Sequence, residues 1–277
     1  MKRALLAAAA IAALALSTSA QAGAVFLTGH DPDYHAQGQT SGQHELAAAL
    51  NFVTGGTYHD GSHKFLWVES FNSPTGGHVT GYNGLDDVGV TSANVDWVNG
   101  AGFATANLSL YSAIVVASSF GGMLTDAELT SLNARAGDIK TYVNAGGGLA
   151  AFAECGPGFF NCDAASISGL VPLYGFVPVT ASAVSTSPPY TVTPYGLTLG
   201  FSNADANDCC THNSFADAAG LNIVDSDAHG VPTTLAGIVR IGDGGFTGTP
   251  EPATWAMMLL GFGGMGAMLR RRRPASA

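Results

Sequence analysis

The chain has 277 residues, of which 47% are hydrophobic and only 11% are charged, and its formal net charge is -10. This length allows one large domain or two small ones, with enough apolar residues for a real core. Six of the ten basic residues lie near the two ends, so that residues 23–249 hold four basic residues against nineteen acidic ones. So acidic a surface repels phosphate backbones, which excludes nucleic acid as a partner.

The first 22 residues have the pattern of a secretory signal peptide. Lys2 and Arg3 precede an apolar run over residues 4–16, and Ala20-Gln21-Ala22 follows it. This order of a basic start, an apolar stretch and an A-x-A site is typical of an exported chain. A retained membrane anchor is the alternative, but the apolar run is shorter than the roughly 20 residues that span a bilayer. We expect signal peptidase to cut after Ala22.

The next elements are expected to be a strand, a helix and a second strand. Residues 23–27 form a short apolar run that ends in a polar loop, as strands do. A helical pattern of apolar residues then runs from Ser41, a plausible N-cap, to Gly55, a plausible stop. Residues 64–69 read as a second strand.

The clearest unit begins at residue 113. Residues 113–118 are a continuous, mostly β-branched run, as expected for a strand covered on both faces. Thr125 and Glu128 then form a capping box that opens a helix through Val143, and three glycines precede another strand over residues 149–153. Strand, helix and strand in this order predict an α/β fold with an open, mostly parallel sheet and helices on both faces.

These segments resemble the class I glutamine amidotransferase-like fold, in particular its trehalose-utilisation-type relatives. The resemblance rests on residues 25–29 and on the stretch from Tyr111 to Glu154. It implies a flavodoxin-like or amidotransferase-like sheet. Beyond Cys155 the match is vague, and shorter strands are expected over residues 168–179, 190–199, 221–225 and 234–241.

Candidate ligand-binding residues follow the expected strands. In open parallel sheets, ligands bind beyond the carboxyl ends of the strands. The residues at these ends are chemically mixed, and a later loop over residues 205–213 could close over the same face. The candidates are His30, Asp31, Asp33 and His35 after the first strand, Ser118 and Ser119 after the central one, Glu154 and Cys155 after the next, and His212 in the loop.

Two readings of the polar loop after the first strand remain open. His30, Asp31, Asp33 and His35 could hold a metal, because imidazole suits zinc and carboxylates suit calcium or magnesium. Their spacing matches no standard ligand motif, however, and Pro32 is typical of an ordinary turn. We therefore expect a hydrogen-bonded loop without a metal. Since the chain has no phosphate-binding loop and no dinucleotide fingerprint, we expect no cofactor.

Cys155 stands where amidotransferase-like enzymes place their nucleophile. The resemblance implies a Gly-x-Cys-x-Gly elbow, whereas here Ala153 and Pro157 replace both glycines. In an oxidising compartment, four cysteines pair in one of three ways. We favour Cys155–Cys162 with Cys209–Cys210, and the alternatives cross-link the two regions. Glu154 and Cys155 are thus weak catalytic candidates.

The last 28 residues resemble the PEP-CTERM sorting signal. An apolar stretch over residues 253–269 lies between the PEP motif and a basic cluster, in the order of a short transmembrane helix with a stop-transfer signal. The resemblance implies an exosortase as partner, which cuts near the motif after transient insertion in the inner membrane. The residues that carry it are Pro250, Glu251, Pro252, Trp255, Arg270, Arg271, Arg272 and Arg273.

We therefore expect an exported protein with a signal peptide over residues 1–22, a mature domain over 23–248 and a sorting signal over 249–277. Its destination is the cell envelope or exopolysaccharide matrix. The missing elbow glycines and the oxidising compartment favour a non-catalytic binding or matrix module. The alternative is a secreted hydrolase that acts on carbohydrate or peptide.

Overall fold

The computed structural model describes residues 22–70, 82–119, 123–152, 171, 174–182, 187–208 and 211–248. The predicted signal peptide, the predicted helix over residues 253–269, Glu154 and all four cysteines lie outside these residues. No helix in the described ranges is long and apolar enough to cross a membrane. Residues 22–248 form one compact unit.

A large open sheet is the centre of the fold, and five of its neighbouring strands are parallel. Three of them, over residues 65–68, 113–116 and 148–151, are short and fully buried, which agrees with the apolar runs that predict them. The strand over residues 95–98 was not predicted and is buried only at Val95. The parallel part has the order β3 (Val95–Val98), β2 (Phe65–Val68), β4 (Ala113–Val116), β5 (Gly148–Ala151), β1 (Gly23–Thr28).

The rest of the sheet is antiparallel, which corrects the expectation of a mostly parallel sheet. β10 pairs antiparallel with β1 along the whole of that strand, and further strands continue outward from it. β1 therefore lies between β5 and β10, whereas in a flavodoxin-like order it lies between β2 and β3. The antiparallel strands are β10 (Pro232–Ile241), β9 (Asn222–Ser226), β7 (Thr191–Val192) and β11 (Phe246–Gly248), and β6 (Ala181–Ser182) pairs with β8 (Ser214–Phe215) apart from them.

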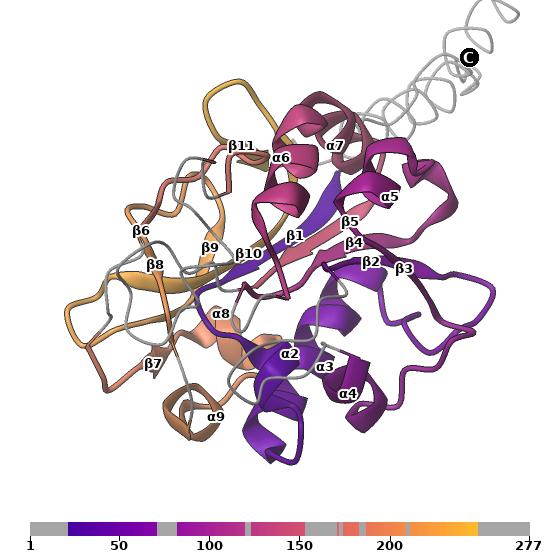
Figure 1. Ribbon diagram of the computed structural model, residues 1–277. Coiled ribbons are helices and arrows are strands. Elements are labelled where there is room, and N and C mark those ends of the chain that lie inside the picture. The colour runs from indigo at the N-terminus through magenta and orange to yellow at the C-terminus, as the bar shows by residue number, and fades with distance from the viewer. Residues whose placement is uncertain are drawn as a thin grey trace, which may run out of the picture. The chain divides into compact units, whose positions relative to one another are not determined.

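Helices cover both faces of the parallel part (Figure 1). On one face lie α5, α6 and α7, and on the other lie α2, α3 and α4. The bounds are α2 (Pro32–His35), α3 (Thr40–Thr54), α4 (Tyr82–Asp87), α5 (Gly100–Thr105), η2 (Leu108–Leu110), α6 (Asp126–Ala134), α7 (Ala136–Asn144), α8 (Pro194–Thr198) and α9 (Asn203–Asp208).

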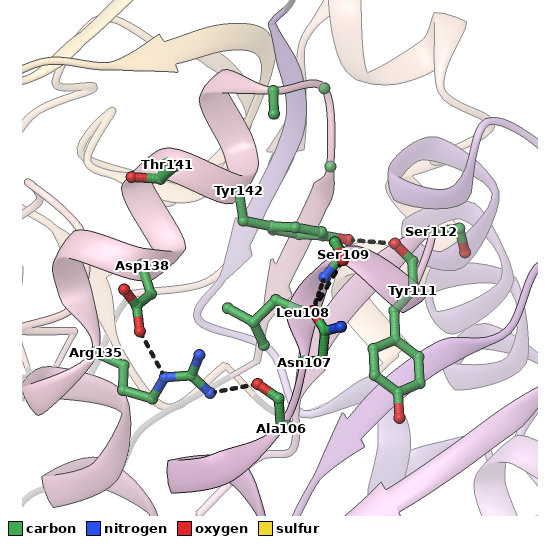
Figure 2. A pocket seen from close by; sticks show the side chains of 13 residues that line it. Ala106, Asn107, Leu108, Ser109, Tyr111, Ser112, Arg135, Asp138, Thr141 and Tyr142 are labelled. Carbon is green, nitrogen blue, oxygen red and sulfur yellow. Dashed lines mark hydrogen bonds and ion pairs between the residues drawn. The ribbon is translucent and has the colours of Figure 1, made fainter.

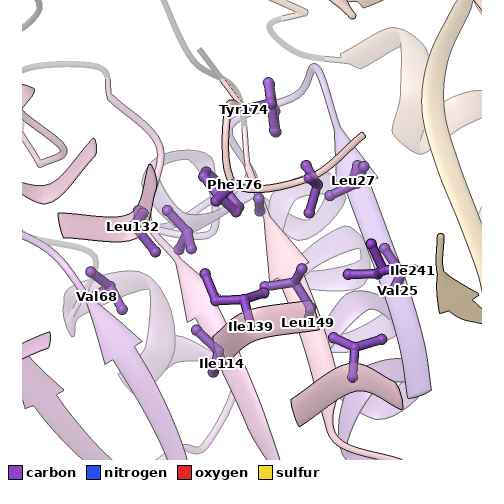
Figure 3. Close-up of a cluster of buried hydrophobic side chains, with 14 of the residues drawn as sticks. Val25, Leu27, Val68, Ile114, Leu132, Ile139, Leu149, Tyr174, Phe176 and Ile241 are labelled. Atoms are coloured by element: carbon purple, nitrogen blue, oxygen red, sulfur yellow. The ribbon is translucent and has the colours of Figure 1, made fainter. Parts of the chain in front are cut away.

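Strand alternation divides the core into two layers. Val25 and Leu27 of β1 pack on the side of α6 and α7, whereas Phe26 between them packs on the side of α3. Figure 3 shows the first layer, where Ile139 of α7 and Leu132 of α6 lie over the strands. Burial on both faces fixes how α2 and the loop after β1 sit at the strand ends.

The predicted βαβ unit is confirmed, with one difference. β4 and β5 are adjacent and parallel, and Thr125 and Glu128 form the predicted capping box. The helix between them is broken at Arg135, whose backbone leaves the helical region, so that α6 and α7 replace one helix. The break lets the Arg135 guanidinium donate to the carbonyl oxygens of Phe103 and Ala106.

Other expectations are met in part. α3 ends at Gly55 in the left-handed conformation, as predicted, but its N-cap is Gln39 and not Ser41. The Ser41 hydroxyl instead donates to Asp208. The strands expected over residues 221–225 and 234–241 are present as β9 and β10.

Two later strand predictions are wrong for most of the described residues that they cover. The strand expected over residues 190–199 is wrong beyond Val192, because Thr193 caps α8 and Pro194 occupies its first turn. Of the strand expected over residues 168–179, the described residues 174–178 form turns.

Candidate functional site

The polar residues after β1 lie in a buried cluster where the chain leaves the sheet. We call it the acid–histidine cluster: His30, Asp31, Asp33, His35, Glu45, His212 and Asp225. Its members come from the loop after β1, from α2 and α3, from β9 and from the segment that begins at Thr211.

Gly29 allows the two chain segments of the cluster to meet. A β-carbon at this position would lie 1.7 Å from the carbonyl oxygen of Asn213, so that only glycine fits. In its absence, the backbone N–H of His212 donates to the carbonyl oxygen of Gly29 at 2.7 Å. His30 and Thr211 form a bridge beside it. The close approach brings His212 next to the start of α2.

His30 and Asp225 form a buried ion pair. Nε2 of His30 lies 3.0 Å from Oδ2 of Asp225, and the two side chains are 3% and 0% exposed. Burial would lower the pKa of His30, but the nearby Glu45 and Asp225 carboxyl groups raise it to about 9. Burial would raise the pKa of Asp225, yet His30 holds it below its ordinary range. Thr233 also donates to this carboxylate, so Asp225 holds a charged imidazole in place.

Glu45 plays a different part beside the same imidazole. It lies 4.0 Å from Nδ1 of His30, beyond hydrogen-bond distance. Burial raises the pKa of Glu45 to about 7, against the attraction of His30. Of the two carboxyl groups, Asp225 is therefore the one within hydrogen-bond distance of His30.

Asp31 lies between two other imidazoles. Its Oδ1 is 3.4 Å from Nε2 of His35, one helical turn away, and its Oδ2 is 3.1 Å from Nε2 of His212. Burial acts to raise the pKa of Asp31, but His212 and His35 hold it below its ordinary value. The Asp31 side chain is fully buried. These are the three residues of the described chain whose donor atoms could converge on a metal ion, all within 4.8 Å of one another.

Asp33 ties α2 to the end of the central strand. Its Oδ2 accepts a hydrogen bond from the backbone N–H of Ser118 at 2.9 Å. Burial raises the pKa of Asp33 to about 7, partly offset by this hydrogen bond. The expected meeting of residues after the first and central strands is thus observed for Asp33 and Ser118.

The space next to the cluster is small. A cavity of about 10 Å³ adjoins His30, Asp31, His35 and Glu45. This volume suits a single water molecule and is far below the several hundred Å³ of a small-molecule site. Among the described residues, the cluster therefore has room for an ion or a water molecule but not for a sugar ring or a peptide.

The structure places some predicted site residues together and leaves others aside. His30, Asp31, Asp33, His35 and His212 belong to the cluster, with Ser118 in contact through its backbone. Ser119 is buried next to Ser118 in the chain. Glu154, Cys155, Cys162, Cys209 and Cys210 lie outside the described residues.

Glu45 and Asp225 were not among the predicted site residues. Each has a signal in the sequence. Glu45 is an acid next to Leu46 on the buried face of α3, and Asp225 is an acid that directly follows the apolar pair Ile223 and Val224 of β9. Ionisable side chains in such positions are rarely buried without a partner. The partner of Asp225 is 195 residues away in the chain, however, and no local pattern identifies it.

A second, larger cavity lies at the amino ends of the parallel strands, whereas the acid–histidine cluster lies at their carboxyl ends. Its volume is about 590 Å³. It is lined by residues of η2 and α7 and by the short segments that lead from them into the amino ends of β4 and β5. Figure 2 shows the Arg135–Asp138 ion pair on one side and the Tyr142 hydroxyl, which donates to the carbonyl of Tyr111, on the other. We call this cavity the η2–α7 cleft.

Comparison with known proteins identifies the C-terminal segment. A family model described as the PEP-CTERM protein-sorting motif matches residues 249–273. No curated protein and no solved structure matches the chain. The expected amidotransferase-like relationship of the mature domain thus finds no support. The sorting motif supports exosortase-dependent export to the cell envelope.

Proposed function

We propose that this protein is exported in two steps and acts in the envelope or exopolysaccharide matrix as a non-catalytic binding module. Signal peptidase removes residues 1–22, the apolar stretch over residues 253–269 holds the chain transiently in the inner membrane, and the exosortase cuts near Pro250. The observation that carries this proposal is the sorting motif at residues 249–273. The compact unit that precedes the motif, from residue 23 to 248 after cleavage, is the part delivered.

The non-catalytic role is argued from the volumes and the lining groups of the two cavities described above. The acid–histidine cluster has the groups that hydrolysis needs, but among the described residues its cavity of about 10 Å³ leaves no place for a substrate. The η2–α7 cleft has the size of a ligand site, yet its ionised groups, Arg135 and Asp138, are paired with each other. The groups suited to catalysis and the cavity large enough for a ligand thus lie in different places. This favours a binding function over the alternative of a secreted hydrolase.

The η2–α7 cleft suits a sugar chain. Its other polar side chains carry hydroxyl and amide groups, from Asn107, Ser109, Ser112, Thr141 and the two tyrosines. Uncharged polar groups next to aromatic rings bind the hydroxyl groups and the apolar faces of sugars at once. We therefore propose matrix polysaccharide as the ligand of this cleft.

Replacement of Pro250 and Pro252 by alanine tests the sorting step in a host that has an exosortase. The variant is expected to stay in the membrane fraction at its uncut mass, because the protease no longer finds its motif. The wild-type protein should begin at Gly23 and end near Pro250 by intact mass spectrometry. Pro274→Ala lies outside the matched residues 249–273 and should be processed normally. Unchanged processing of the double variant would contradict the proposal.

Thr141→Trp tests the binding step. Thr141 is exposed on α7 and lines the cleft, so a tryptophan there fills the space that a ligand would occupy. Co-sedimentation of the exported protein with the host's exopolysaccharide should weaken at least about tenfold. Thr130→Trp, on the exposed side of α6, is the matched control and should bind as wild type. Release of soluble sugar or peptide by the wild-type protein would instead support the hydrolase.

A further inference from the structure

We propose that Asp31, His35 and His212 bind one zinc ion, which fastens the segment after residue 210 to the start of α2. The proposal goes beyond the binding function. It concerns the carboxyl ends of the parallel strands, whereas the η2–α7 cleft lies at their amino ends. It replaces the expectation of a metal-free turn after β1.

The three donors lie close enough together to converge on one ion. Two imidazole nitrogens and one carboxylate are a common zinc ligand set. With metal–ligand distances near 2.1 Å, neighbouring donors around zinc lie about 3.4 Å apart. Here Nε2 of His212 and Nε2 of His35 lie 3.1 and 3.4 Å from the carboxylate oxygens of Asp31, and the three residues' donor atoms fall within 4.8 Å of each other.

The state of Asp31 points to a ligand independently of that spacing. Its side chain is 0% exposed, and within the described part of the chain neither of its oxygens accepts a hydrogen bond. A buried carboxylate without hydrogen bonds is costly, unless a cation compensates it. Each oxygen instead has an imidazole nitrogen at ion-pair distance, that of His35 at 3.4 Å and that of His212 at 3.1 Å, where one ion could replace both contacts.

The surroundings favour a cation and allow a fourth ligand. Asp33 and Glu45 add carboxyl groups beside Asp31, and Asp205 lines the same small cavity. The charged His30, which also lines this cavity, is paired with Asp225. That cavity, of about 10 Å³, adjoins Asp31 and His35 and has room for one water molecule, which would complete four-coordination from their side. Because no larger space adjoins it among the described residues, we assign the ion a structural role.

The arrangement also explains why His212 lies where it does. α2 has a single turn and supplies Asp31, at its N-cap, and His35, four residues on. His212 comes from a segment joined to β1 by the backbone hydrogen bond to Gly29 and by the His30–Thr211 bridge. An ion bound by all three residues would lock segments that are 177 residues or more apart in the chain.

The first test is the metal content of the full chain, exported by its own host, without a histidine tag and in buffers without chelators. We expect one zinc per chain. After removal by a chelator, added Zn²⁺ at about 100 times its dissociation constant should raise Tm by roughly 5–10 °C. Mg²⁺ at the same concentration should not, because it prefers oxygen ligands. Absence of zinc together with an unchanged Tm on Zn²⁺ addition would overturn the proposal.

Two substitutions locate the site. His35→Gln and His212→Gln should each weaken Zn²⁺ binding on the order of 100-fold or more. When Co²⁺ is added in place of Zn²⁺ as a spectroscopic probe, both variants should lack the absorption bands of four-coordinate Co²⁺. His63→Gln is the matched control, since His63 also pairs with an aspartate, Asp60, but is 60% exposed. It should bind Zn²⁺ as wild type. Equal zinc affinity in all three variants would show that the ion binds elsewhere.

A variant that is less stable without metal can still be tested, because the metal-free wild-type protein gives the reference. If the site is real, Zn²⁺ raises the Tm of the wild-type protein and of His63→Gln, but not that of His35→Gln, which lies at the more exposed rim of the site. A rise in Tm of the same size for His35→Gln would overturn the proposal. These readouts do not depend on sorting or on polysaccharide binding, so that the two proposals can fail separately.

Discussion

Gly148→Ala is expected to lower the free energy of unfolding by about 3 kcal/mol or more. A β-carbon at this first residue of β5 would lie 1.9 Å from the carbonyl oxygen of Val53, at the end of α3. That neighbour is backbone, so the clash can be relieved only if α3 moves away from the sheet. α3 supplies much of one core layer, which makes such a movement costly.

Gly137→Ala is the matched control for Gly148→Ala. Gly137 lies in α7 with no atom within 4 Å of its added β-carbon. Alanine there should raise the free energy of unfolding by up to about 1 kcal/mol, since glycine is unfavourable in a helix. Denaturant unfolding of both variants checks the pair. If Gly148→Ala were as stable as Gly137→Ala, the close packing of α3 on β5 would be wrong.

Asp225→Ala is expected to lower the free energy of unfolding by about 3–5 kcal/mol near neutral pH. The change leaves the His30 imidazole buried without its nearest counter-charge, and removes the acceptor for the Thr233 hydroxyl. Its effect should exceed that of Asp60→Ala, which removes the acid of an exposed histidine pair and should change stability little.

A double-mutant cycle separates the pair from the burial of each residue. His30→Ala combined with Asp225→Ala should cost less than the sum of the two single substitutions, because no unpaired charge remains in the double variant. Denaturant unfolding of the four proteins provides the measurement. Additive losses would mean that the 3.0 Å contact carries no interaction energy, and would contradict the assignment of Asp225 as the partner of His30.

Local patterns were enough to predict four of the five parallel strands, whereas β3 was not predicted. The capping box of Thr125 and Glu128, the end of α3 at Gly55 and the strands β4 and β5 depend on neighbours within a few residues. The break at Arg135 was missed, and the carbonyl groups that its guanidinium contacts are about thirty residues away in the chain, beyond the reach of a local pattern. The antiparallel part was missed because the direction of β10 depends on its pairing with the free side of β1. The sequence of a strand does not indicate which strand it pairs with.

The candidate site divides in the same way. His30, Asp31, Asp33 and His35 could be found because polar residues that follow a buried strand lie at its carboxyl end. Glu45 and Asp225 could not, because helix and strand patterns mark them only as acids on buried faces and do not say what they face.

The sequence by itself determined where this protein goes, because a sorting motif is read as a linear segment and matches at residues 249–273. It also determined the βαβ unit, whose signals are local. Only the tertiary structure decided the order of the sheet, the pairing of His30 with Asp225 and the meeting of Asp31, His35 and His212. These depend on contacts between segments far apart in the chain, which form only when the two core layers pack and Gly29 and Gly148 let backbones approach.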